Sequence, residues 1–200
     1  RDLRMSRGLG DVYKRQEICV CQKIHYMQDS VKVGELGEKA VMDFLLTKNY
    51  VQNYLDVRGD KTYWEKDVDY FIMFIDKSCH PIEIKTDTYS HTGNIFYEDI
   101  SCIERNTPGC FQKTKARWLF YYFVNDGTLY IIHVKKFREW YERNKHRFRT
   151  TTVTNEILDK NRRHTGKFFH SSGHLIPRAE IELLDCVRKH HIDNTLSQIA

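Results

Sequence analysis

The sequence lacks several features that define well-known classes of protein. No stretch approaches the roughly 20 apolar residues of a membrane-spanning helix, and no charged-then-apolar start resembles a secretion signal. A glycine-rich phosphate-binding loop and a serine-centred nucleophile elbow are missing, so neither ATP-driven chemistry nor a serine nucleophile is indicated. The six cysteines show no two-residue spacing typical of zinc or thioredoxin-type sites. We therefore expect no membrane partner and, because the thiols form no disulfide framework, a cytoplasmic location.

The apolar content predicts a folded domain. Hydrophobic residues make up 40% of the 200 residues, with 11 Phe and 12 Tyr among them. A chain of this length buries roughly 70% of its unfolded surface and needs neither disulfides nor a metal to stay folded. The first 16 residues, RDLRMSRGLGDVYKRQ, show no helical or strand periodicity. We expect them to be a non-native or disordered extension, and 17–200 to be one domain with its core at about 31–134 and a basic elaboration at about 135–200.

The net charge of +5 is unevenly distributed. The segments 1–16, 17–134, 135–167 and 168–200 carry +3, −4, +7 and −1. A basic segment is by default a solvent-exposed face. Next to an acidic cluster, it also fits a protein whose basic residues hold a polyanion while a metal bound by the acidic cluster cleaves it. The candidate nucleic-acid contacts are Lys113, Lys115, Arg147, Arg149, Arg162 and Arg163.

Hydrophobic periodicity predicts an α+β fold with a mixed sheet flanked by helices. Apolar residues at three- and four-residue steps predict a helix over 31–48. Predicted strands cover 51–57, 68–75, 81–86 and 95–100. A hairpin over 118–124 and 129–134 is closed by Asn125-Asp126-Gly127, and a helix follows over 134–144. We expect loops and short strands over 145–178, and a last helix from Pro177 to near His191.

The stretch most informative about chemistry joins the second and third predicted strands. Glu83 and Lys85 share one strand face, because side chains alternate. A hairpin centred on Asp76 places Asp69 across from Glu83, with Cβ atoms about 5 Å apart. The same register places Asp67 across from Lys85. Two carboxylates this close repel unless a cation or a proton lies between them, and hard oxygen ligands suit Mg²⁺ or Mn²⁺.

The first predicted helix contributes further carboxylates. Glu35 and Glu38 are three residues apart and lie on similar faces, each preceded by a glycine, Gly34 and Gly37. Glycine within a helix costs about 1 kcal/mol relative to alanine. Close approach of the helix to the sheet or to a ligand is one reason to tolerate that cost.

An acidic helix residue, an Asp on one strand and Glu-x-Lys on the next resemble the motif of the PD-(D/E)xK nuclease superfamily over about residues 31–134. The resemblance implies a restriction-endonuclease-like core and a Mg²⁺- or Mn²⁺-dependent endonuclease that acts on DNA. It implies metal ligation by Asp69 (Asp67 is the alternative), Glu83 and the Ile84 carbonyl. It also implies that Lys85 assists the attacking water or stabilises phosphate charge, and that Glu38, or Glu35, completes the site. A two-fold substrate would favour a homodimer.

Two other interpretations remain open. A module that retains the fold could bind nucleic acid without cleaving it. Taken singly, the carboxylates and Lys85 are ordinary surface residues. The third interpretation is therefore an α+β domain whose acidic strand face has no function. Asn94, Tyr97 and Glu98 either border the substrate or belong to a plain strand.

Overall fold

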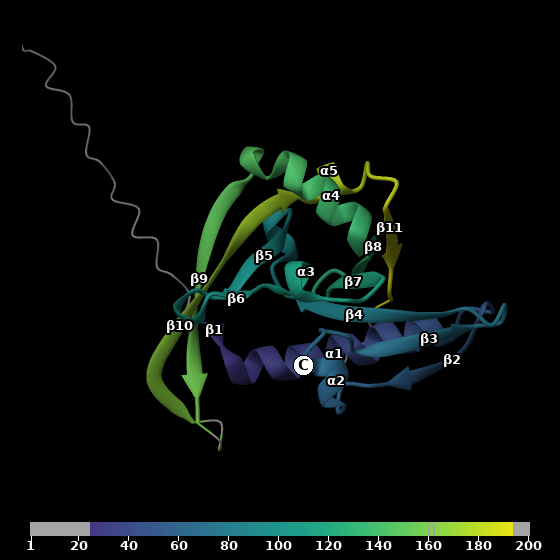
Figure 1. Ribbon diagram of the computed structural model, residues 1–200, viewed down its shortest axis with the longest axis horizontal. Coiled ribbons are helices and arrows are strands. Elements are labelled where there is room, and N and C mark those ends of the chain that lie inside the picture. The colour runs from purple at the N-terminus through teal and green to yellow at the C-terminus, as the bar shows by residue number, and fades with distance from the viewer. Residues whose placement is uncertain (1–24, 160, 162, 194–200) are drawn as a thin grey trace, which may run out of the picture.

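The computed structural model describes residues 25–159, 161 and 163–193, and its helices and strands form an α+β fold with two sheets (Figure 1). The expected extension over 1–16 and the candidate contact Arg162 lie outside the described residues. One sheet has six strands in the order β11-β8-β7-β4-β3-β2, and the other has five in the order β1-β9-β10-β5-β6.

The six-stranded sheet contains β2 (Val51–Asp56), β3 (Tyr70–Phe74), β4 (Cys79–Asp87), β7 (Trp118–Phe123), β8 (Thr128–His133) and β11 (Val187–His191). It is mixed, because β4 and β7 are parallel whereas the other neighbours are antiparallel. The predicted strands and the hairpin across Asn125-Asp126-Gly127 are confirmed. Gly127 has φ 68°, the left-handed conformation that a tight Asp-Gly reversal favours.

The five-stranded sheet contains β1 (His25–Tyr26), β5 (Asn94–Cys102), β6 (Thr107–Pro108), β9 (Arg149–Leu158) and β10 (His164–Pro177). The helices are α1 (Met27–Leu46), α2 (Lys61–Trp64), α3 (Cys110–Lys113), α4 (Val134–Asn144) and α5 (Arg178–Ile181). Short 3-10 turns occur at Ser90–Thr92, Ile103–Arg105 and Lys145–Arg147.

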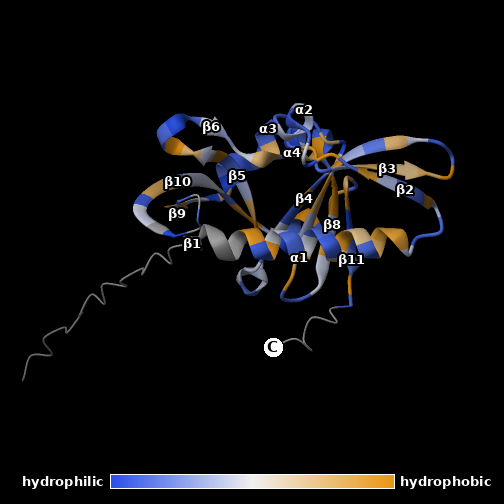
Figure 2. Cartoon of the chain, turned by 90° about the horizontal axis from the view of Figure 1, so that it is seen from below, coloured by the Kyte–Doolittle hydropathy of each residue, from blue (hydrophilic) through white to orange (hydrophobic). Residues whose placement is uncertain are grey.

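Helix α1 covers one face of the six-stranded sheet. Its buried residues Val41, Met42 and Leu45 pack on apolar side chains of β3, β4, β7 and β8. Hydrophilic and hydrophobic residues alternate along α1 in Figure 2, as expected for an amphipathic helix with one buried face. The apolar periodicity that predicted this helix therefore corresponds to its contact with the sheet.

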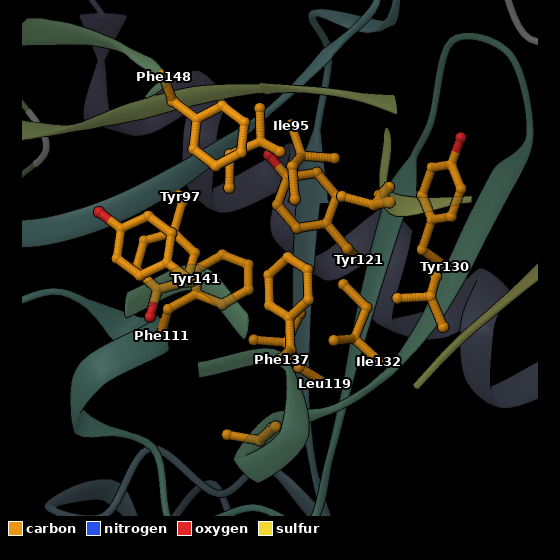
Figure 3. Packing of buried hydrophobic residues seen from close by; sticks show 14 of the residues in the cluster. Ile95, Tyr97, Phe111, Leu119, Tyr121, Tyr130, Ile132, Phe137, Tyr141 and Phe148 are labelled. Atoms are coloured by element: carbon orange, nitrogen blue, oxygen red, sulfur yellow. The ribbon is translucent and has the colours of Figure 1, made fainter. Parts of the chain in front are cut away.

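The opposite face of that sheet packs against α4, α3 and the second sheet (Figure 1). The core there is largely aromatic. The Tyr97 ring of β5 lies between Tyr141 and Phe111, with ring centroids 3.5 Å and 4.4 Å away (Figure 3). Because Tyr97 comes from one sheet and packs with Phe137 of the helix that follows the other, this core joins the two sheets.

Two predictions for the C-terminal part are wrong. The segment expected to be loops and short strands forms the long antiparallel pair β9 and β10. The expected last helix is only the single turn α5, and the chain then extends as β11 along the edge of β8. Pairing with β8 satisfies the backbone groups of both strands, which outweighs a short apolar repeat at helical spacing.

Candidate active site

Asp69 and Glu83 lie side by side at one end of the β3–β4 hairpin. The ladder has the register that the hairpin centred on Asp76 predicted and ends with Tyr70 opposite Ile82; the Asp69 and Glu83 carboxyl groups contact each other just beyond this end. The backbone N–H of Asp69 donates to the Ile82 carbonyl at 2.9 Å. The Asp69 carboxylate accepts the Ile84 N–H at 2.8 Å. Backbone contacts to β4 therefore hold the Asp69 carboxyl group in place.

The two carboxyl groups are within hydrogen-bonding reach of each other, and their titration is linked. Burial is the main reason that the pKa of Glu83 is raised well above its ordinary value, and the charges of Asp69 and Asp67 add to it. Burial also raises the pKa of Asp69, although the Ile84 N–H favours its charged form. Without a cation, the pair is best described as two acids that share a proton.

Glu83 has an unsatisfied oxygen at this point. Its Oε2 atom is buried and has no hydrogen-bond partner among the described residues. An orphaned buried acceptor is costly, by about 1–3 kcal/mol or more when charged. Such an atom suits a site that is completed by something outside the chain, and hard divalent cations prefer carboxylate oxygens.

Lys85 lies two residues further along β4, with a side chain that is 26% exposed. Its Nζ is 3.9 Å from Oε2 of Glu98 on β5. Burial disfavours the ammonium charge, but the charges of Cys110 and then of Glu98, Asp87 and Glu83 raise the pKa of Lys85. The Cys110 thiol is neutral at neutral pH, because burial raises its pKa to about 12. With the thiol uncharged, Glu98, Asp87 and Glu83 are the acids near Lys85 that favour its ammonium form.

Glu38, not Glu35, is the helix carboxylate nearer to this site. Glu35 is exposed, whereas the Glu38 side chain is 20% exposed. Burial raises the pKa of Glu38, and the negative charge of Asp69 contributes to the shift. Gly37 explains how α1 comes so close, since a Cβ there would lie 2.0 Å from Oγ1 of Thr86 on β4. Gly34 has nothing within 4 Å of such a Cβ, so the close-approach argument holds for Gly37 alone.

Arg58 is a component of the site that the sequence patterns did not reveal. It forms ion pairs with Glu38 and with Asp56 and lies over the Tyr70 ring, 4.9 Å from its centroid. These contacts join the loop after β2 to a helix residue 20 positions earlier. The only sequence signal for Arg58 is that it follows Asp56, the last residue of β2, by two positions. That spacing does not indicate that Arg58 also pairs with Glu38 of the helix.

The expectation that Asp67 lies across from Lys85 is wrong. Asp67 has φ 45° and precedes the β3 ladder, so it has no partner on β4. Its carboxylate instead accepts a hydrogen bond from Lys113 Nζ at 2.7 Å. Asp69 is thus the residue that meets Glu83, while Asp67 acts on the pair through its charge.

The candidate nucleic-acid contacts are dispersed. Lys113 pairs with Asp67 beside the acidic pair, and the neighbouring Lys115 is exposed. Arg147 Nη2 is 3.2 Å from Glu180 Oε2. Arg149 is exposed at the first residue of β9, and Arg163 is exposed in the connection between β9 and β10. Lys113 is therefore the cation of this set that the structure connects to the acidic pair.

The three residues proposed as a substrate border have different positions. Glu98 adjoins Lys85, as described above. Tyr97 is fully buried in the aromatic core, so a position at the substrate border is wrong for it. Asn94 begins β5 and donates from its side chain to the Thr92 carbonyl, a local turn contact.

Within the described part of the chain, no group of three or more His, Cys, Asp or Glu side chains is arranged to hold a metal ion. Asp69 and Glu83 thus offer a two-carboxylate set. A cavity of about 520 Å³ lies elsewhere, lined by α1 and by residues 191–193. None of the described helices has the length and apolar character to cross a membrane.

Comparisons with known proteins returned no match: no family model, no curated protein and no solved structure resembles the chain.

Proposed function

We propose that the protein is a metal-dependent nuclease that hydrolyses DNA phosphodiester bonds, similar in its site to PD-(D/E)xK enzymes. The observation that carries the proposal is the Asp69–Glu83 pair with its orphaned Glu83 oxygen, next to the charged Lys85. Burying two acids together is unfavourable, and a divalent cation removes the repulsion between them.

The donors fit Mg²⁺ or Mn²⁺ chemically, since all are hard oxygens. Asp69 and Glu83 would hold the ion, with the Ile84 carbonyl as a further candidate. A bound divalent cation lowers the pKa of water and offsets charge that develops on a phosphate. Glu38, which Arg58 neutralises, would influence the ion through its charge or through water.

Lys85 would bind and orient the scissile phosphate. Because its pKa is raised, Lys85 is a cation at neutral pH and is suited to stabilising negative charge rather than to accepting a proton. Glu98, 3.9 Å from Lys85 Nζ, would restrict the position of the ammonium group. An electrostatic contact of this kind typically contributes about 10²–10³ in rate.

The test is cleavage of supercoiled plasmid in Mg²⁺ by the wild type and by Lys85→Met, which keeps the apolar stem and removes the charge. Lys39→Met is the matched control, because Lys39 is 73% exposed on α1. We expect a rate loss of about 10²-fold or more for Lys85→Met and none for Lys39→Met. No cleavage by the wild type, or equal rates for wild type and Lys85→Met, would show the proposal to be wrong.

One observation favours a second candidate, a module that binds nucleic acid without cleaving it. Glu38 is already paired with Arg58, so among the described residues the site offers a metal two carboxylates, Asp69 and Glu83. This candidate is expected to give salt-sensitive DNA binding, with no cleavage and no change in thermal stability on addition of Mn²⁺.

A further inference from the structure

Trp64 is unusually exposed for its residue type. It ends the short helix α2, and 65% of its surface is accessible to solvent. Tryptophan is highly buried on average in folded proteins, so an exposed ring needs an explanation. The buried clusters formed by the described residues do not include Trp64. The ring therefore does not serve as core packing.

The backbone around Trp64 is nevertheless well fixed. The Asp60 side chain caps α2 by accepting the Thr62 N–H. The Trp64 carbonyl accepts the Asp67 N–H at 3.2 Å, and the Lys66 carbonyl accepts the Lys115 N–H at 2.8 Å. These bonds tie the segment to the loop after α3, so little conformational entropy remains to be lost when a ligand contacts the ring.

One lysine lies near the ring, and two more are exposed in the adjoining loops. Lys113 Nζ lies 5.7 Å from the ring centroid, and Lys66 and Lys115 are exposed in the same pair of hydrogen-bonded loops. Two acids of this segment are already paired with lysines, Glu65 at 3.8 Å from Lys61 and Asp67 at 2.7 Å from Lys113, and Asp60 caps α2. An aromatic platform among lysines is complementary to a nucleic-acid strand, which carries a base face and phosphates.

The platform also adjoins the candidate active site. Asp67, which contacts Lys113, lies two residues before Asp69, and its charge contributes to the raised pKa of Glu83. A strand whose base contacts Trp64 would thus pass close to the acidic pair. Bases inside a duplex are stacked on their neighbours and cannot offer a free face, whereas bases of single strands and frayed ends can.

We propose that Trp64 stacks on an unpaired nucleobase, so that the substrate is DNA with a single-stranded segment or end next to the cleaved bond. The inference rests on the proposed nuclease function and specifies its substrate class. Lys66 and Lys115 contact the phosphates that flank this base.

The test measures binding of fluorescein-labelled DNA in EDTA, so that cleavage plays no part. The ligands are a single strand, a blunt duplex and the same duplex with a single-stranded extension. The variants are Trp64→Ala, Trp64→Phe, which keeps an aromatic ring, and Ile75→Ala, since Ile75 is equally exposed at 65% but lies in the turn that follows β3. Light scattering gives the oligomeric state of each variant.

The wild type should prefer DNA that has a single-stranded part. Trp64→Ala should weaken the binding of these DNAs about tenfold and leave the affinity for the blunt duplex largely unchanged. Trp64→Phe and Ile75→Ala should retain the preference for DNA with a single-stranded part. Unchanged single-strand affinity in Trp64→Ala, or a change in oligomeric state in place of a change in affinity, would overturn the inference while the nuclease proposal stands. If neither the wild type nor any variant binds any of the DNAs, both the stacking inference and the nuclease proposal are wrong.

Discussion

Glu83 is a residue whose environment opposes its own charge. It is buried beside Asp69, and its Oε2 lacks a hydrogen-bond partner among the described residues. Groups held in unfavourable states at the expense of stability are frequent in functional sites. At the residue scale, therefore, the same carboxylate oxygens lower the stability of the metal-free protein and offer ligands to a cation.

Glu83→Gln is expected to stabilise the metal-free protein at neutral pH, because a neutral amide avoids both the burial of a second charge beside Asp69 and the uptake of the proton that neutralises it. Each pKa unit by which folding raises the pKa of Glu83 corresponds to about 1.4 kcal/mol. A gain of about 1 kcal/mol would raise the melting temperature by about 2–4 °C. The measurement is thermal unfolding in EDTA with Glu35→Gln as the exposed control. A melting temperature of Glu83→Gln at or below that of the wild type would contradict the electrostatic argument.

The same residue determines a pH dependence. The folded protein holds the Glu83 proton more tightly than the unfolded chain, whose glutamate pKa is near 4.5. Stability is therefore favoured below that pH and decreases as the pH rises through the raised pKa of the folded state. Glu83→Gln should flatten this part of the curve of unfolding free energy against pH, measured in EDTA. An unchanged curve would rule out the proposed titration of Glu83.

At the scale of elements, the contact between α1 and β4 determines where Glu38 lies. Gly37 permits that contact because it has no Cβ to meet Thr86. Gly34, one turn earlier, has free space around it. The two glycines look equivalent in the sequence, and only the packing of the helix on the sheet distinguishes them.

The two glycines should respond oppositely to alanine. Gly34→Ala is expected to stabilise the fold by up to about 1 kcal/mol through helix propensity. Gly37→Ala is expected to destabilise it by about 1–3 kcal/mol, because the new Cβ must displace Thr86 or the helix. Urea unfolding of both variants checks this. Stabilisation by Gly37→Ala would mean that α1 does not approach β4 as described.

Sequence periodicity predicted the helices and strands whose apolar residues are the ones that pack in the core. The apolar repeat along 31–48 matches the buried face of α1, and the turn at Asp76 gave the β3–β4 register. The β-branched run Thr150–Thr154 is typical of a strand and marks β9, but its polar, basic surroundings favoured loops. Arg58 could not be predicted, because its partner Glu38 is brought close only by the folded sheet and helix.

At the scale of the whole molecule, the two sheets share one aromatic core. Tyr97 of β5 and Tyr121 of β7 both contact Phe111, which belongs to α3 between these strands (Figure 3). Glu98 follows Tyr97 along β5 and reaches Lys85 of the other sheet. The core therefore aligns the second sheet with the acidic hairpin, and the relative position of Lys85 and Glu98 depends on the assembly of both sheets.

The central claim is that Asp69 and Glu83 together bind a divalent cation. The most direct measurement is a calorimetric titration of Mn²⁺ into the full chain, the Glu83→Gln variant and the exposed control Glu35→Gln. Binding to the wild type and to Glu35→Gln, with loss of at least about tenfold in affinity for Glu83→Gln, is the expected result. Equal Mn²⁺ affinity in all three proteins, or no binding to the wild type, would contradict the claim.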